Sequence, residues 1–196
     1  MYLFSRMMVW LARSRHSRGM GVQSPSAYRF IRYVVNEHYP YYAYEDLGSM
    51  PFSISKRRIK LCRFYFRLSN FCQPSVIFNY GSRTEAYEVY MKRGCMKAVV
   101  LNQQHGQPDI LRTIDKLDMA RISLVGNYPA VVNDAISKAH SQSVFVVEHI
   151  KRNKETWKYW QSLVQDSRVA VTYDLYYCGV LCFDKNIFKQ NYIVNF

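Results

Sequence analysis

The spacing of apolar residues along the chain changes near residue 76. Before that position, apolar side chains recur every three or four residues, which predicts one helix from Ser24-Pro25 to about His38 and another from Ser55 to about Cys72. The serine and proline that open the first helix are typical of an N-cap and a first helical residue. Between the two helices, "YPYYAYEDLGSMP" reads as an aromatic linker that ends in turn residues.

The second predicted helix carries a basic stripe. Its apolar residues face inward and its basic residues lie on another face: Ile59, Cys62 and Phe66, then Lys56, Lys60, Arg63 and Arg67. One interpretation of the stripe is a solvated helix face. The other is a face that binds phosphate groups.

From residue 76 onward, short apolar runs alternate with helical patterns. Strands are predicted at 76–78, 97–101, 121–125 and 144–147, and helices at 83–93, at 108–118, from Pro129 and from Asn153. Residues 169–175 and 179–183 predict a closing antiparallel pair, and residues 191–196 predict a last strand. We therefore expect an α/β fold, with a mostly parallel sheet between two layers of helices and a terminal antiparallel hairpin.

The net charge of +13 is distributed unevenly. Residues 1–73 hold 12 Lys or Arg against three acidic residues, a net charge of +9, whereas residues 74–196 hold 15 against 11, a net charge of +4. This difference predicts a basic helical extension, residues 1–73, packed on an α/β domain, residues 74–196. The basic third favours an anionic partner, which would be nucleic acid, a membrane surface or an acidic protein.

The first 18 residues contain no acidic residue and read as an amphipathic helix. Its apolar face would consist of Leu3, Phe4, Met7, Met8 and Leu11. Such a helix either packs on the domain or contacts a membrane or a partner. No apolar run approaches the roughly 18 residues of a spanning helix, so we expect no transmembrane segment.

The five cysteines predict no metal site and no disulfide framework. They form no CxxC pair, and no Cys/His group has the spacing of metal ligands. An odd number of cysteines is typical of buried, reduced thiols, which favours a cytoplasmic location.

Polar residues follow the predicted strands at five places: Asn79-Tyr80-Gly81-Ser82, Asn102-Gln103-Gln104, Gly126-Asn127-Tyr128, Glu148-His149 and Asp174. In sheets of this kind, ligands bind beyond the carboxyl ends of the strands. The sequence therefore predicts that these residues surround a binding site.

The segments "SRGMGVQSPSAYRFI", "EHYPYYAYEDL" and "WKYWQSLVQDSRVAVTYDLYYCGVLCF" resemble a bacterial class I S-adenosylmethionine-dependent methyltransferase-like family with an O-methyltransferase-type domain. The resemblance runs nearly end to end. It implies a Rossmann-like methyltransferase fold, with the methyl donor bound across the first two strand ends. It also implies Asn79, Tyr80, Gly81, Ser82, Asn102, Gly126 and Asn127 as the donor-binding positions.

The chain departs from the family at the residues that would hold the donor. The family ends its first two strands in acidic residues. This chain has Asn79 or Tyr80 at the first of these positions and Asn102-Gln103-Gln104 at the second, and Gly81 remains from a glycine-rich turn. A second departure is the short connection between Leu101 and Ile122, which leaves no room for the strand and helix that the family places there. That strand lies at the edge of the sheet, so its deletion leaves the central strand pairs intact.

These departures predict a pseudoenzyme that keeps the fold and has lost S-adenosylmethionine binding. One alternative is an active methyltransferase for a small molecule or a macromolecule, in which Glu148 or His149 takes a proton from the acceptor. In the structural interpretation, Glu148 is instead a paired carboxylate and His149 a surface histidine. Another alternative is a basic module on the same fold that binds nucleic acid or a protein partner.

Overall fold

The computed structural model describes residues 8, 11, 13, 21–49, 55–82 and 84–196. The helices are α2 (Pro25–Phe30), the π-helical η2 (Ile31–Val35), α3 (Ala43–Gly48), α4 (Lys56–Cys72), α5 (Thr84–Gly94), the 3-10 helix η3 (Ile110–Thr113), α6 (Tyr128–Ser137) and α7 (Lys154–Gln165). The strands are β1 (Val76–Tyr80), β2 (Val99–Gln103), β3 (Leu117–Ser123), β4 (Ala139–Glu148), β5 (Val171–Asp174), β6 (Cys178–Cys182) and β7 (Gln190–Ile193).

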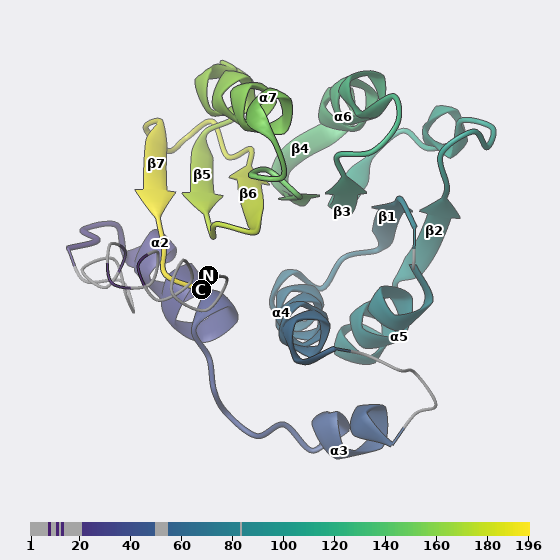
Figure 1. The fold of residues 1–196 in the computed structure, drawn as a ribbon, viewed down its shortest axis with the longest axis vertical. Helices are drawn as coiled ribbons and strands as arrows, with labels where there is room; N and C mark the ends of the chain where they lie inside the picture. The colour runs from purple at the N-terminus through teal and green to yellow at the C-terminus, as the bar shows by residue number, and fades with distance from the viewer. Residues whose placement is uncertain (1–7, 9–10, 12, 14–20, 50–54, 83) are drawn as a thin grey trace.

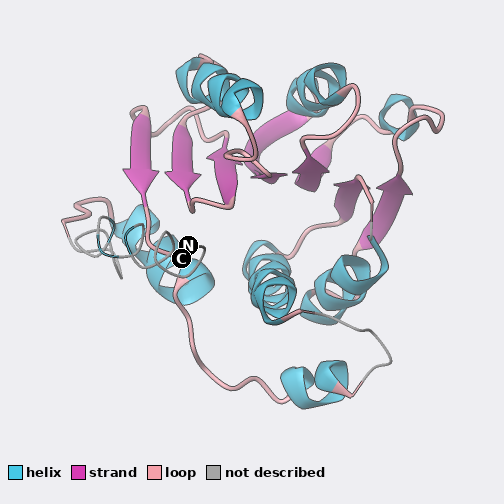
Figure 2. Cartoon of the chain, viewed as in Figure 1, coloured by secondary structure: helices cyan, strands magenta, loops and turns pink. Residues whose placement is uncertain are grey.

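The seven strands form one mixed sheet in the order β2-β1-β3-β4-β6-β5-β7. The first four run parallel, β6 is antiparallel to both β4 and β5, and β7 is parallel to β5. Helices α4 and α5 cover one face of the sheet and α6 and α7 cover the other (Figures 1 and 2). The predicted α/β fold with a terminal antiparallel hairpin is confirmed.

Strand β2 lies at one edge of the sheet, beside β1, as the short connection after Leu101 predicts. The helix predicted at 108–118 is wrong, because Asp109 caps only the single turn of η3. The chain is already part of β3 at Leu117, whose side chain is buried and which pairs with Ala139. The connection between β2 and β3 therefore holds one helical turn and no additional strand.

The two faces of the sheet have separate hydrophobic cores. On one face, residues of α2, α4 and α5 pack against alternate residues of the strands, and on the other face α6 and α7 do so. Within the basic third of the chain, the described helices α2 and α4 share a core with the strands. The domain boundary at residue 73 stays a prediction. Of the predicted N-terminal apolar face, Met8 and Leu11 are described, and both side chains are exposed.

The predicted basic face of α4 is wrong at Arg67, whose side chain is buried. The first helical segment ends at Val35 instead of His38, in the π-helical turn η2. Arg67 Nε donates a hydrogen bond to Val34 O at 2.7 Å, and Nη2 donates to Val35 O at 3.2 Å. These carbonyls lie at the end of the helix and lack donors of their own. The expected linker that follows also contains the helix α3.

We expect Asp118 to make the fold sensitive to acid. Burial by itself raises the pKa of this carboxyl, but hydrogen bonds from Val76 N, His140 Nε2 and Ser75 N outweigh it and lower the pKa. The contribution to stability is present above the unfolded pKa, about 3.9, and is lost as the pH falls through the folded value. In Asp118→Asn, the fall in the free energy of unfolding from about pH 5 to about pH 3 should be smaller than in the wild type.

Urea unfolding at the two pH values measures this difference. Asp115→Asn removes an exposed carboxylate close by and should leave the fall at its wild-type size. An equal fall in Asp118→Asn and the wild type would contradict the assignment.

Candidate functional site

The carboxyl ends of β1, β2, β3 and β4 bring three of the predicted site residues, Asn79, Asn102 and Glu148, together on the face covered by α4 and α5. Asn79 is in register with Asn102 on β2 and with Arg121 on β3. Side chains alternate along a strand, so these three residues share one face with Glu148 at the end of β4. The sequence predicted Asn79, Asn102 and Glu148 at this place but not Arg121.

The centre of the site is a buried ion pair. Arg121 Nη2 lies 2.7 Å from Glu148 Oε2, and the two side chains are 2% and 4% exposed. The second carboxylate oxygen accepts a hydrogen bond from the hydroxyl of Tyr65 on α4 at 2.7 Å. The guanidinium also lies over the ring of Tyr87 on α5, 4.4 Å from its centroid. Both charges are therefore held inside the protein, between the sheet and the two helices that cover this face.

Both members of the pair are charged. Burial by itself raises the pKa of Glu148, but the charge and hydrogen bonds of Arg121 and the hydroxyl of Tyr65 outweigh it and hold the pKa below its usual value. Burial lowers the pKa of Arg121, and the carboxylate of Glu148 outweighs that effect and raises it. A carboxylate with both oxygens hydrogen-bonded and little exposure is poorly placed to take a proton from a bound substrate.

A chain of amides extends from the ion pair toward the edge of the sheet. Arg121 Nη1 donates to Asn79 Oδ1 at 3.2 Å, and Asn79 Nδ2 donates to Asn102 Oδ1 at 2.8 Å. Asn102 Nδ2 in turn donates to Glu88 Oε2 on α5 at 2.6 Å. Asn79 is fully buried. The ends of β1 and β2 are therefore linked to each other by a side-chain hydrogen bond.

The loop after β1 packs against β3. Gly81 has φ +121°, and a Cβ atom there would lie 2.7 Å from Ser123 Cβ and 3.6 Å from Arg121 Nη1. The glycine therefore lets the loop lie directly on these two side chains. Ser82 is exposed, whereas Tyr80 points to the opposite core and its hydroxyl donates to Val125 O at 3.3 Å.

His149, the second predicted catalytic residue, lies beside the same loop. Its Nδ1 is 2.9 Å from Ser123 Oγ, and its backbone is left-handed with φ +66°. A non-glycine residue in that conformation is uncommon, and the bond from His149 N to Tyr177 O at 3.0 Å holds it there. The imidazole is exposed, unlike the carboxylate of Glu148.

The loops after β2 and β3 contact each other. Gly126 has φ +60°, and a Cβ atom there would lie 2.1 Å from His105 Nδ1, so the imidazole of His105 rests on this glycine. Asn127 is exposed and precedes α6 as its N-cap residue, without a side-chain cap. The predicted residues Gly126 and Asn127 thus lie at the strand ends and are exposed, and the ring of His105 lies against one side of the glycine.

Asp174 forms a separate charged cluster at the end of β5. Its two carboxylate oxygens lie 2.8 Å from Arg13 Nη2 and 3.0 Å from Lys151 Nζ. Burial lowers the pKa of Lys151 and outweighs the attraction of Asp174. The cluster joins the N-terminal segment, through Arg13, to the last part of the sheet.

Arg121, Tyr65, Tyr87 and Glu88 are the site residues that sequence reasoning missed. An arginine at the start of the apolar run "RISLV" is the one signal of a buried charge, because most strand interiors hold no arginine. The described residues contain no group of three His, Cys, Asp or Glu arranged to hold a metal ion. No described helix is long and apolar enough to cross a membrane.

The sheet order, the terminal hairpin and the polar strand ends define a Rossmann-like fold of the class I S-adenosylmethionine-dependent methyltransferases. Three solved structures with this fold are cofactor-bound Rv0187 from MTB, the Bacillus cereus O-methyltransferase in complex with SAH, and the SAH-bound Podospora anserina methyltransferase PaMTH1. They are 14%, 12% and 12% identical to this chain, with TM-scores of 0.55, 0.52 and 0.52. The matches cover 74%, 76% and 81% of this chain and 87%, 94% and 93% of theirs.

At these identities the likeness shows the fold. No protein-family model matches the sequence, and no curated protein matches it. The predicted Rossmann-like methyltransferase fold is confirmed, and the roles of the individual strand-end residues stay predictions.

Proposed function

We propose that this chain is a pseudoenzyme: a methyltransferase-like binding module whose donor site has become part of the structural core. The observation that carries the proposal is the buried Arg121–Glu148 ion pair beneath Gly81. In the family that the chain resembles, an acid at the end of the first strand, where this chain has Asn79 or Tyr80, faces the cationic end of S-adenosylmethionine. Here the group beneath the loop is a guanidinium, and the neighbouring carboxylate is already bonded to it.

The residues present do not fit the donor. Asn79 is fully buried and its amide oxygen accepts from Arg121, so it offers nothing to a ligand above the loop. Asn102, at the position that would hold the ribose hydroxyls, is neutral and bonded to Asn79 and Glu88. Each charged hydrogen bond lost costs roughly 1.5–3 kcal/mol. Two such losses weaken binding by roughly two to four orders of magnitude.

We expect no binding of S-adenosylhomocysteine to the wild-type chain at about 1 mM ligand in titration calorimetry. Asn102→Asp combined with Glu88→Gln is the matched test of the reason, because the amide of Asn102 donates to Glu88 Oε2 and an aspartate there needs a donor in place of that carboxylate. It restores one carboxylate at a half-buried position without changing the size of the side chain, so it should increase affinity if the missing charge limits binding.

Micromolar binding by the wild-type chain would overturn the proposal, provided that Ser82→Trp abolishes it. Ser82 is exposed in the loop after β1, so a tryptophan there blocks the approach to the strand ends without disturbing the core. The active-methyltransferase alternative requires that outcome. The cytoplasmic location stays a prediction.

A further inference from the structure

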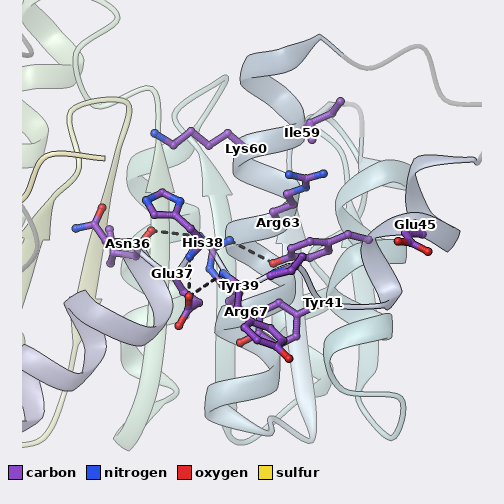
Figure 3. A pocket seen from close by; sticks show the side chains of 13 residues that line it. Asn36, Glu37, His38, Tyr39, Tyr41, Glu45, Ile59, Lys60, Arg63 and Arg67 are labelled. Carbon is purple, nitrogen blue, oxygen red and sulfur yellow. Dashed lines mark hydrogen bonds between the residues drawn. The ribbon is translucent and has the colours of Figure 1, made fainter.

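A cavity of about 480 Å³ lies on the basic part of the chain, outside the sheet and its strand ends. It is formed by the connection between η2 and α3 together with one face of α4 (Figure 3). Basic and aromatic side chains line it, among them Tyr39, Tyr41, Tyr44, Lys60, Arg63 and Arg67. The volume lies in the usual range for small-molecule sites, roughly 300–1,000 Å³.

Arg67 contributes a buried positive charge without a carboxylate partner. Its side chain is 6% exposed, and its three hydrogen bonds go to neutral atoms: Val34 O, Val35 O and the hydroxyl of Tyr44. All 14 acidic residues lie in the part of the chain that the structure describes, and none forms an ion pair with Arg67 within 4.0 Å. A buried charge without a counter-ion is costly, and a bound anion offsets that cost.

Two further cations come from the same face of α4. Arg63 is four residues before Arg67, and Lys60 is three residues before Arg63, so helical spacing aligns the three side chains. The Arg63 guanidinium lies over the ring of Tyr44 at 4.7 Å, and Lys60 Nζ lies over the ring of Phe196 at 4.4 Å. Stacking of this kind fixes a guanidinium while its N–H groups, which lie in its plane, remain directed past the ring.

The aromatic side chains supply flat surfaces beside these cations. Tyr41 packs edge-to-face against Tyr39 at 5.5 Å and against Tyr44 at 5.4 Å between ring centroids. The Tyr39 side chain is 60% exposed, which leaves ring surface for a ligand to cover. Tyrosine rings stack with planar heterocycles, and such contacts depend little on which heterocycle is bound.

Two acidic residues, Glu37 and Glu45, also line the cavity. The carboxylate of Glu37 is engaged by the backbone: it accepts hydrogen bonds from His38 N and Tyr39 N, both at 2.7 Å. With three basic residues against two acids, the lining keeps a net positive charge. It therefore favours an anion with an aromatic ring over a cation of the same shape.

We propose that this cavity binds a mononucleotide, with its phosphate on the cations of α4 and its base on the tyrosines of the η2–α3 connection. The site is independent of the strand ends, so it does not rest on the state of the donor site. It also gives the basic third of the chain a specific ligand instead of a general attraction for anions.

Titration calorimetry with AMP, adenosine and inorganic phosphate tests the proposal on the full chain. AMP should bind more tightly than adenosine or phosphate, since it alone meets both halves of the site. Arg63→Glu should weaken AMP binding at least about tenfold, by reversing one charge at the phosphate. Lys158→Glu makes the same change of charge at an exposed position of α7 and should leave AMP binding unchanged.

Three outcomes would overturn the proposal. The first is no AMP binding at about 10 mM, and the second is AMP affinity that is equal in the wild type and Arg63→Glu. The third is binding of phosphatidate vesicles that AMP does not displace, which would assign the cations to a lipid surface. Because Ser82→Trp and Arg63→Glu change different sites, a failure here is distinguishable from a failure at the donor site.

Discussion

Replacing Arg121 with methionine is expected to lower the free energy of unfolding by about 3–5 kcal/mol. The substitution leaves the Glu148 carboxylate, 3% exposed, without its charged partner and with a hydrogen bond from the hydroxyl of Tyr65. A buried charge that has lost its partner pays the cost of desolvation without compensation. Urea unfolding of the purified variant, followed by circular dichroism, measures the loss.

A second substitution separates the ion pair from general damage to the core. The double variant Arg121→Met with Glu148→Met removes both charges, and it should recover much of the loss because apolar replacements of a buried pair are often neutral or stabilising.

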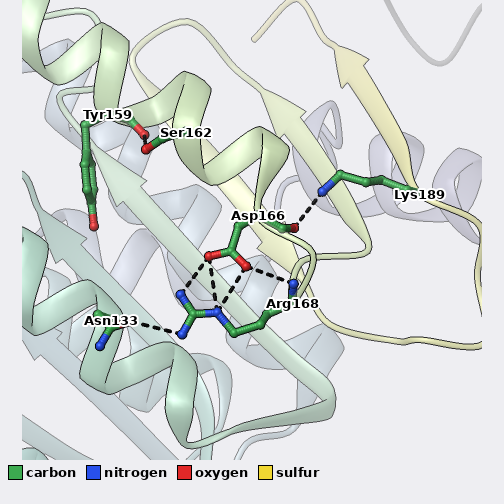
Figure 4. Close-up of polar contacts among 6 residues, drawn as sticks. All are labelled: Asn133, Tyr159, Ser162, Asp166, Arg168 and Lys189. Atoms are coloured by element: carbon green, nitrogen blue, oxygen red, sulfur yellow. Dashed lines mark hydrogen bonds and ion pairs between the residues drawn. The ribbon is translucent and has the colours of Figure 1, made fainter.

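The loss of stability in Arg121→Met should also be compared with the loss caused by the same substitution in an exposed ion pair. Arg168 binds the carboxylate of Asp166 at 2.7 Å between α7 and β5 (Figure 4), with 44% of its side chain exposed. Arg168→Met should cost no more than about 1 kcal/mol.

Equal costs for Arg121→Met and Arg168→Met would contradict the role of the buried pair. A double variant less stable than Arg121→Met alone would do so as well, because it would show that the carboxylate stabilises the core without its partner.

Trp160→Ala is expected to cost about 3–5 kcal/mol, the range for truncating a buried aromatic residue. Trp160 is 2% exposed and connects α7 to the sheet. Its ring lies so close to Gly179 on β6 that a Cβ atom there would be 2.2 Å from the ring. The neighbouring Trp157 on the same helix is only half-buried, so Trp157→Ala should cost clearly less. Thermal and urea unfolding give both values.

The contact with Gly179 provides a further check of this packing. Gly179→Ala should destabilise the wild-type chain by about 1–3 kcal/mol because the added methyl group has no space. In a Trp160→Leu background the same substitution should cost less, since the indole no longer occupies the position. Costs that are equal in the two backgrounds would contradict the observed packing.

Local signals in the sequence predicted most of the fold. Ser24 was predicted as a helix N-cap, and a helix was predicted to start at Asn153. The side chains of both residues accept hydrogen bonds, from Ala27 N and Thr156 N. The mostly parallel sheet and the short connection after β2 follow from the spacing of the elements, whereas the order of the strands comes from the structure. The helix predicted at 108–118 was wrong because its pattern did not show that Asp118 binds the backbone of Ser75 and Val76, more than 40 residues earlier.

The candidate site was less accessible to sequence reasoning. Glu148 was identified by its position after a predicted strand, but its partner Arg121 is 27 residues away and Tyr65 is 83 residues away. Such pairings depend on which strands become neighbours and which helix covers them. The prediction for Arg67 was wrong for a similar reason. The helical pattern placed its side chain on the basic face with Lys60 and Arg63, whereas hydrogen bonds to the carbonyls of η2 hold it in the interior.

The buried ion pair also has a consequence for how the chain assembles its sheet. Arg121 and Glu148 reach each other only when β3 and β4 pair in the observed register, with Ser123 opposite Glu148. A slip of one residue would turn Glu148 to the face of α6 and α7, and both charges would then be buried without an ion-pair partner. Two apolar residues could fill the same space in either register at little cost. The pair thus discriminates between correct and incorrect strand alignments, and a chain without it would be freer to misfold.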